Sequence, residues 1–311
     1  MDAQVRSVQP GGGIVMGIEL AWGKIRRQYL RWFRPRYVAQ MRACRRGLQG
    51  GCPFDPIDPR DVKYYRNQGT YSWDIKDDPY AWRDRLPFVR AGLAELVLLT
   101  GACWLIAGGF LLLGWHLHPI GYIVALAAAV ISALVIWFFR NPKRAIPQGP
   151  GEVVSPADGK IVAIEEIEDP LLGPAIEIGI FLSIFNVHAN RAPIAGRVLG
   201  IEYRPGKMLN ALRPESAKEN ERLEVRIESP SPPFQLMRVR QITGQFARRI
   251  VCWVRPGDVL QRGEMFGMIK LGSRTELVLP RTHDLELVIK VGDRVQAGSS
   301  LLARYESPPD E

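Results

Sequence analysis

The sequence predicts a mainly β (α+β) domain in its C-terminal half, preceded by an α-helical transmembrane hairpin. Two observations lead to this fold class. Two long apolar segments lie close together near the middle of the chain, at about residues 91–114 and 120–139. From about residue 147 onward, short segments of β type alternate with Gly, Pro and Asp, and helical periods are scarce. These patterns divide the chain into residues 1–85, 86–140 and 141–311.

Composition excludes several classes of protein. Of the 311 residues, 47% are hydrophobic and 23% are charged, which is incompatible with a wholly disordered chain. Four cysteines are too few for a disulfide scaffold. The 41 basic residues outnumber the 32 acidic ones, and the net charge of +9 favours an anionic partner such as an acidic membrane surface. No nucleic-acid-binding module accompanies this charge, so we expect no nucleic acid partner.

Residues 1–85 form a basic N-terminal extension that is partly helical and partly irregular. Residues 18–46 combine basic residues with aromatic ones and predict a helix that Pro35 breaks or kinks. Two interpretations remain open for this stretch: a helix lying on anionic lipid, or a solvated arm with a few packing aromatics. Residues 47–79 are rich in Gly, Pro and Asp and predict irregular structure.

The two apolar segments are each long enough to cross a hydrocarbon core of ~30 Å. The first contains one charged residue, Glu95, and the second contains none. Five residues, from Trp115 to Pro119, join them, which favours an antiparallel helical hairpin. The link contains no Lys or Arg, whereas basic residues flank the other two ends: Arg83, Arg85, Arg90, Arg140, Lys143 and Arg144. The positive-inside rule therefore places both termini in the cytoplasm, although a buried helical pair in a soluble protein remains an alternative.

Five segments of the C-terminal region alternate at period two or are apolar throughout, which predicts strands: residues 159–164, 175–181, 196–203, 223–227 and 248–254. The region also contains a weak internal repeat, because residues 254–263 are similar to residues 290–298. Each copy places Gly-Asp in a turn and ends in Gly, which resembles the hairpins of lipoyl- and biotinyl-like barrels.

Common catalytic motifs are missing from the sequence. There is no C-x-x-C, H-E-x-x-H, G-x-x-x-x-G-K-[ST], G-x-G-x-x-G or G-x-S-x-G. We therefore expect no metal site, and the usual nucleotide-binding and serine-hydrolase classes are disfavoured.

Three strings remain that could carry chemistry. They are V-S-P-A-D-G-K at 154–160, F-N-V-H-A-N-R-A-P at 185–193 and F-G-M-I-K-L-G-S-R at 266–274. Each alone fits a turn or a structural histidine. Together and in this order they closely resemble the phosphatidylserine decarboxylase proenzymes of the shorter, pyruvoyl-dependent type. The resemblance extends over about residues 139–305, and residues 1–85 have no counterpart in it.

The resemblance implies a self-processing enzyme. The Ser273 hydroxyl attacks the Gly272 carbonyl, elimination then breaks the chain, and a covalent pyruvoyl group replaces Ser273 at the start of the new α chain. The β chain would comprise residues 1–272 and the α chain residues 273–311. The pyruvoyl group is then the cofactor that holds electrons during decarboxylation of phosphatidylserine to phosphatidylethanolamine. The expected partners are this lipid and the two chains themselves.

Asp158 and His188 are the expected partners of Ser273. A carboxylate beside an imidazole would orient it and raise its basicity, so that His188 could take the serine proton and later return a proton to the substrate. The longer bacterial enzymes have a second histidine where this sequence has Arg191. The role that His188 inherits is therefore open. Arg191, Lys207 and Arg213 are candidate substrate-binding residues, the last two in a long loop at residues 204–220.

Two alternatives stay open from sequence alone. One is a non-enzymatic membrane adaptor or carrier with a lipoyl-like barrel, although no Met-Lys-Met or Asp-Lys-Ala hairpin is present. The other is a decarboxylase of a related serine phospholipid. A homo-oligomer is compatible with the sequence. We expect the protein in the cell membrane, with its catalytic domain facing the cytoplasm.

Overall fold

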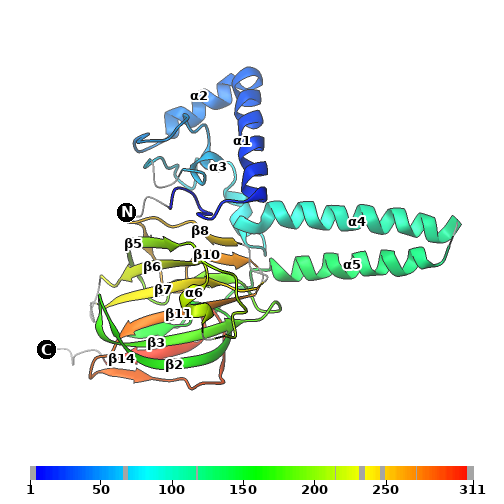
Figure 1. Cartoon of the computed structure of the whole chain (residues 1–311). Helices are drawn as coiled ribbons and strands as arrows, with labels where there is room; N and C mark the ends of the chain where they lie inside the picture. The colour runs from blue at the N-terminus through cyan, green and yellow to red at the C-terminus, as the bar shows by residue number, and fades with distance from the viewer. Residues whose placement is uncertain are drawn as a thin grey trace.

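The computed structural model describes residues 5–65, 69–116, 118–213, 215–230, 235–245, 249–270 and 272–306. Figure 1 shows three parts: a helical N-terminal part, a long helical hairpin that projects from the molecule, and a strand-rich C-terminal part. The fold is therefore mixed α+β, with strands dominating the C-terminal region, as the sequence predicts.

The N-terminal part contains α1 (Ile14–Phe33), α2 (Pro35–Cys44) and the short α3 (Pro59–Val62). The predicted break is confirmed, since α1 ends at Phe33 and Pro35 opens α2. A buried carboxylate holds these helices together: Asp61 pairs with Arg26 and Arg27 of α1. Its second oxygen accepts the backbone N–H of Ile57 at 2.9 Å. Apart from α3 and the 3₁₀ helix η1 (Ala81–Arg85), the rest of the N-terminal part is irregular among the described residues.

The hairpin consists of α4 (Leu93–His116), which follows the 3₁₀ helix η2 (Arg90–Gly92), and α5 (Ile120–Phe138). Both helices are long and apolar enough to cross a membrane, and most of their surface is exposed. Small residues let them pack closely: a Cβ at Gly121 would lie 2.5 Å from the Gly114 nitrogen. Two antiparallel helices that cover each other on one side and expose apolar residues elsewhere are suited to lipid surroundings.

The C-terminal part is built on an antiparallel eight-stranded sheet in the order β13-β2-β3-β11-β7-β6-β5-β9. Two three-stranded sheets, β1-β14-β12 and β4-β10-β8, complete it. Four of the five predicted strand segments are confirmed within slightly longer strands, whereas the fifth, predicted at residues 248–254, forms a strand only over Arg249–Cys252 among the described residues. The strands are β1 (Glu152–Val154), β2 (Gly159–Asp169), β3 (Gly173–Leu182), β4 (Ala189–Arg191), β5 (Gly196–Arg204), β6 (Arg222–Glu228), β7 (Leu236–Thr243), β8 (Arg249–Cys252), β9 (Val259–Leu260), β10 (Met265–Lys270), β11 (Ser273–Pro280), β12 (Leu285–Leu287), β13 (Arg294–Val295) and β14 (Leu301–Tyr305). A short helix, α6 (Ser216–Glu219), lies between β5 and β6.

The two copies of the sequence repeat form equivalent turns. Asp258 accepts the backbone N–H of Arg255 at 2.9 Å, and Asp293 accepts that of Lys290 at 3.0 Å. The glycine before each aspartate has a positive φ. Each turn then leads into a two-residue strand. These strands, β9 and β13, lie at opposite edges of the large sheet. The sequence similarity therefore reflects shared local geometry.

The first described residues do not stay with the N-terminal helices. Val5 is buried in the core of the strand-rich part. The Val8 carbonyl accepts the N–H of Cys252 in β8 at 2.9 Å, and the Val8 side chain packs in one cluster with Leu96 of α4 and Phe138 of α5. Residues 5–12 thus connect the strands, the base of the hairpin and the start of α1, which a division at residue 85 does not capture.

Candidate functional site

The Gly272–Ser273 bond lies at the membrane-hairpin end of the central strand β11. Ser273 pairs with Leu182 of β3 on one side and Thr243 of β7 on the other. Gly272 has φ +62°, a conformation that glycine adopts without steric cost. The Ser273 hydroxyl is fully buried and has no hydrogen-bond partner among the described residues. A buried hydroxyl without a partner is costly and is therefore a candidate reacting group.

His188 is the base nearest to this bond. Its Nε2 lies 3.3 Å from the Gly272 nitrogen and accepts that N–H, while its Nδ1 lies 2.9 Å from the Asn186 carbonyl oxygen. The carbonyl can only accept, so Nδ1 carries the proton and Nε2 is free to act as an acceptor. The imidazole is fully buried against the Phe138 ring, with centroids 4.5 Å apart. Burial lowers the pKa of His188 to about 4, so the ring is neutral at physiological pH.

Gly244 shapes the space around the Gly272 carbonyl, and sequence reasoning did not identify it. A Cβ at Gly244 would lie 2.6 Å from the Gly272 oxygen and 3.2 Å from the Ala211 Cβ. The loop that contains Ala211 therefore approaches the Gly272–Ser273 bond. Gly244 shows no recognisable motif in the sequence, because its role arises from strand pairing rather than from a local pattern.

Buried polar side chains fix the strands beneath the bond. The Asn190 amide donates to the Thr275 hydroxyl at 3.0 Å, and the Gln241 amide donates to Asn190 Oδ1 at 2.9 Å. Thr275 lies two residues after Ser273, on the same face of β11. All three side chains are fully buried, so this network sets the position of β11 relative to the strand that follows His188.

Asp158 does not pair with His188, which corrects the expected arrangement. Its carboxylate accepts two hydrogen bonds from Arg144, at 2.7 and 2.8 Å, and one from the Ala297 N–H at 2.8 Å. A guanidinium, which is always charged, is a better partner for a buried carboxylate than a neutral histidine whose Nδ1 is already bonded to a carbonyl. Asp158 therefore fastens the segment after the hairpin to the strand-rich part.

The three substrate-binding candidates have different surroundings. Arg191 is buried and donates to the Gly263 carbonyl at 2.8 Å and to Asn141 Oδ1 at 2.9 Å, so its guanidinium is held inside the protein. Lys207 is exposed but pairs with Glu219 at 2.6 Å. Arg213 is exposed in the loop that approaches the site. The structure thus brings His188, Gly272 and Ser273 together, and keeps Arg191 away from them by using both of its terminal nitrogens elsewhere.

The base of the hairpin contacts the site directly. Lys270, three residues before Ser273, forms a mostly buried ion pair with Glu95 of α4. The Phe185 carbonyl accepts hydrogen bonds from Trp137 at 3.2 Å and from Arg140 at 2.8 Å. Sequence reasoning did not assign these roles. The signal for Glu95 was present, because a single carboxylate in an apolar segment requires a cationic partner.

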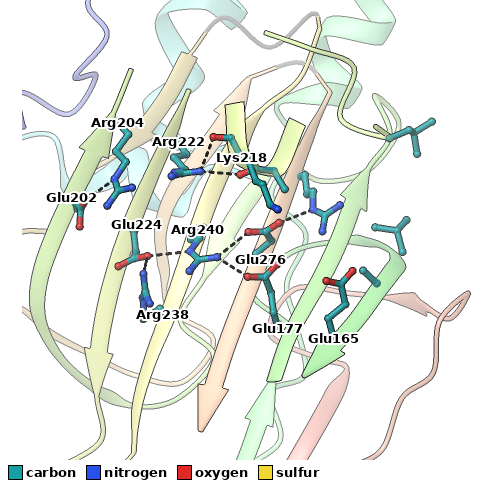
Figure 2. Close-up of a pocket in the computed structure, with 15 residues that line it drawn as sticks. Glu165, Glu177, Glu202, Arg204, Lys218, Arg222, Glu224, Arg238, Arg240 and Glu276 are labelled. Carbon is teal, nitrogen blue, oxygen red and sulfur yellow. Dashed lines mark hydrogen bonds and ion pairs between the residues drawn. The ribbon is translucent and has the colours of Figure 1, made fainter. Parts of the chain in front are cut away.

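A cavity of about 520 Å³ lies on the charged face of the large sheet (Figure 2). Arg240 is at its centre and contacts Glu177 at 2.6 Å, Glu224 at 3.1 Å and Glu276 at 3.3 Å. Burial is the main cause that raises the pKa of Glu276, and the neighbouring Glu177 adds to it. The acidic and basic side chains that line the cavity pair with one another, so their charges largely cancel. In the parts of the chain that the structure describes, no group of three His, Cys, Asp or Glu side chains could hold a metal ion.

Comparison with known proteins identifies the family of this chain. The sequence profile described as "Phosphatidylserine decarboxylase" matches residues 131–303. A protein of Rhodopirellula baltica named "Phosphatidylserine decarboxylase proenzyme" is 58% identical over 79% of this chain and 99% of its own length. Proteins with the same name from Carboxydothermus hydrogenoformans and Syntrophus aciditrophicus are 41% and 38% identical, over 62% and 74% of this chain and 94% and 100% of their own lengths. This chain belongs to the phosphatidylserine decarboxylase family.

Proposed function

We propose that the chain is a carboxy-lyase that converts phosphatidylserine to phosphatidylethanolamine, after cutting itself between Gly272 and Ser273 and forming a pyruvoyl group from Ser273. The family, whose members are named proenzymes, supports this proposal. The observation that carries it is a buried, unpartnered Ser273 hydroxyl beside a glycine bonded to the neutral His188 ring.

Cleavage begins with the Ser273 hydroxyl. Oγ attacks the Gly272 carbonyl carbon, the amide becomes an ester, and the Ser273 nitrogen takes a proton. β-Elimination then transfers the Cα proton of residue 273 to solvent and breaks its Cβ–Oγ bond, which releases residues 1–272 with a C-terminal carboxylate and leaves dehydroalanine at 273. Water replaces the nitrogen, which leaves as ammonia, and the new N-terminus is a ketone. Gly272 leaves the attacked carbon open, since a Cβ there would meet nothing within 4 Å.

His188 is the base that we assign to this step. Its Nε2 accepts the N–H of Gly272, the residue next to Ser273, and would have to release that N–H before it could take the hydroxyl proton. The ring is neutral because burial disfavours the imidazolium. A neutral imidazole can accept a proton at Nε2. It can donate a proton from Nε2 to the substrate only after it has accepted one.

The residues present fit a pyruvoyl group at position 273. The orphaned hydroxyl and the positive φ of Gly272 place a reactive serine at the start of a rigid strand. Once formed, the ketone supplies the electron sink that amino-acid decarboxylation needs. Phe138 at the end of α5 packs against the His188 ring, so the base of the hairpin forms one wall of the site.

The hairpin would bring this site to its lipid. We propose that α4 and α5 cross the cell membrane with the strand-rich part in the cytoplasm. Phe138, the last residue of α5, stacks on His188, so the site would lie at the depth of the lipid head groups. Arg213, and Lys207 once released from Glu219, are the proposed contacts for the lipid phosphate. The two equivalent Gly-Asp turns further support hairpins like those of lipoyl-type barrels.

Electrophoresis of the purified protein under denaturing conditions tests the proposal. Purified protein should separate into a β chain of residues 1–272 and an α chain of residues 273–311, and the α chain should react with a hydrazine probe. Ser273→Ala should remain a single chain of 34.9 kDa without hydrazine reactivity. Detergent-solubilised wild type should release carbon dioxide from phosphatidylserine. A wild-type chain that stays whole and carries no reactive carbonyl contradicts the proposal.

A matched lipid assay separates the substrate alternatives. Diacyl and ether-linked serine phospholipids share a head group, so they are tested in parallel at equal concentration. Faster turnover of the ether lipid would identify a related serine phospholipid as the substrate, with the same cleavage chemistry.

A further inference from the structure

Helix α1 leaves many large apolar side chains uncovered. Seven of them are exposed along it, whereas its buried side chains include two arginines, Arg26 and Arg27, together with Met16 and Leu30. The exposed set, the apolar stripe, comprises Ile14, Ile18, Trp22, Ile25, Tyr29, Trp32 and Phe33. At 100° per residue these positions fall within about 100° of the helix circumference. A surface helix of a soluble protein would bury such a stripe.

The apolar stripe is not covered by the rest of the chain that the structure describes. Ile14 is 82% exposed, Trp32 69% and Ile25 62%. The helix is held through its other side, where Asp61 pairs with Arg26 and Arg27 and Leu30 packs with Val38 and Ile57. The contacts that fix α1 to the protein thus leave the stripe available to an apolar partner.

The position of α1 indicates which partner this is. In Figure 1, α1 starts at the base of the hairpin, and its axis makes a steep angle with the axes of α4 and α5. The α2 and α3 region lies on the side of α1 away from the hairpin, so its free side is the side toward which the hairpin extends (Figure 1). The base of the hairpin anchors this placement: Val8, six residues before α1, packs with Leu96 and Phe138. A membrane crossed by the hairpin would therefore lie against the free side of α1.

Charge supports the same partner. Lys24, Arg31, Arg34 and Arg36 are exposed on α1 or just after it, and the structure gives none of them an ion-pair partner among the described residues. Lys24 and Arg31 fall on the polar side of the helix, at about 280° and 260° on a wheel that starts at Ile14, and the middle of the apolar stripe lies at about 50°. A basic polar side opposite an apolar stripe suits a helix in the interface of a bilayer with acidic lipid.

We propose that α1 is an in-plane membrane helix, with its apolar stripe inserted into the acyl boundary of the leaflet from which the hairpin enters. This inference rests on the membrane hairpin of the proposed function. The molecule would then hold the bilayer at two places, through a crossing hairpin and a helix lying beside it. Together they fix how the Ser273 site is oriented against the lipid surface.

Photo-crosslinking in the full-length protein tests this. A benzophenone amino acid is placed singly at Ile18 or Ile25 on the stripe, at the exposed Gln28, which lies about 90° from the middle of the stripe, and at Leu105 in the middle of α4. The proteins are reconstituted in vesicles of phosphatidylcholine and phosphatidylglycerol. We expect lipid adducts at Ile18 and Ile25 at least tenfold above those at Gln28. Adducts at Leu105 report separately on the hairpin.

The pattern of crosslinks distinguishes failure of the α1 proposal from failure of the membrane hairpin. Lipid adducts at Leu105 with none above the Gln28 level at Ile18 and Ile25 overturn the α1 proposal and leave the hairpin intact. Stripe adducts to a second protein chain overturn it as well and identify a protein interface. No adducts at Leu105 contradict the hairpin itself, and thereby the membrane placement in the proposed function.

A matched pair of charge variants adds a second test. Ile18→Glu with Ile25→Glu places two carboxylates on the stripe, and should lower lipid adducts from a probe at Trp22 at least fivefold. Gly17→Glu with Gln28→Glu adds the same charge away from it, and a Cβ at Gly17 meets nothing within 4 Å. The control should leave the Trp22 adducts unchanged, and an equal loss in both variants would contradict the proposal.

Discussion

The Asn186 carbonyl decides the chemistry of His188. By accepting a hydrogen bond from Nδ1 at 2.9 Å, it leaves Nε2 as the acceptor that faces Gly272. The sequence expectation of a carboxylate partner would have made the ring more basic. The structure instead gives a ring whose basicity burial lowers. A base of this kind stays unprotonated at every pH at which the protein is expected to work.

The buried His188 should make stability depend on pH. Its pKa in the folded state is about 4, below the ordinary value of 6.5, so the unfolded chain binds more protons between these values. Stability should therefore fall as pH decreases from about 6.5 to about 4, by on the order of 3 kcal/mol at most. Denaturant unfolding of Ser273→Ala in detergent, with and without His188→Gln, measures this slope. The slope should be shallower without the histidine, and identical slopes would show that other groups cause it.

Gly244→Ala should slow self-cleavage. The added Cβ would lie 2.6 Å from the Gly272 oxygen, so the scissile carbonyl must move away from Ser273. A displacement that costs about 1.4 kcal/mol in the transition state slows the reaction tenfold. The time course of precursor loss after synthesis measures the rate. Gly200→Ala is the control, since a Cβ there meets only Arg226 Cδ at 3.9 Å. Equal rates of self-cleavage in both variants would show that Gly244 does not affect the site.

At the scale of elements, the base of the hairpin and the strand before the cut act as one unit. Lys270 of β10 and Glu95 of α4 are paired with side chains only 9% and 13% exposed. Phe138 of α5 covers His188 from the other helix. The hairpin is therefore part of the site as well as a candidate anchor.

Replacing only one member of the Glu95–Lys270 pair should lower the free energy of unfolding more than replacing both members. Either Lys270→Met or Glu95→Gln leaves a buried group without its partner, and removing one partner of a buried pair costs about 3–5 kcal/mol. The double variant removes both charges and should recover most of that loss. Unfolding in detergent of all four proteins gives the coupling energy, and the precursor fraction shows whether processing follows it. Additive single effects would mean that the two side chains do not interact.

For the whole molecule, a membrane-crossing hairpin would set which side of the membrane each part occupies. Basic residues lie at the base of the hairpin and none lies in the short link at its tip. Because positively charged ends remain in the cytoplasm, the tip should be outside. The strand-rich part and the N-terminal helices would then share the cytoplasmic side, where both could reach the same leaflet.

Cysteine labelling checks this orientation. In a background without the four native cysteines, His118→Cys at the tip should react with an impermeant maleimide added to intact spheroplasts. Leu48→Cys, at a position 77% exposed in the N-terminal part, should react only after the membrane is opened. Labelling of Leu48→Cys from outside would reverse the orientation, and labelling of neither site would place the tip within the membrane.

Local patterns of the sequence determined much of this protein. The two apolar segments, the helix break at Pro35 and the strand segments follow from hydrophobic periodicity and from the geometry of proline, which act over a few neighbouring residues. The Gly272–Ser273 pair and His188 were found in short strings, because their chemistry needs particular residue types in order.

Tertiary structure alone decided which residues meet. The pairing of Asp158 with Arg144, the buried position of Arg191 and the contact of Gly244 with the Gly272 carbonyl join segments that are far apart in the chain. Such partners are chosen by strand register and by competition among buried charges, neither of which leaves a local pattern. Sequence periodicity could identify α1 as a helix, but which of its faces remains uncovered was settled by the packing of its polar side around Asp61.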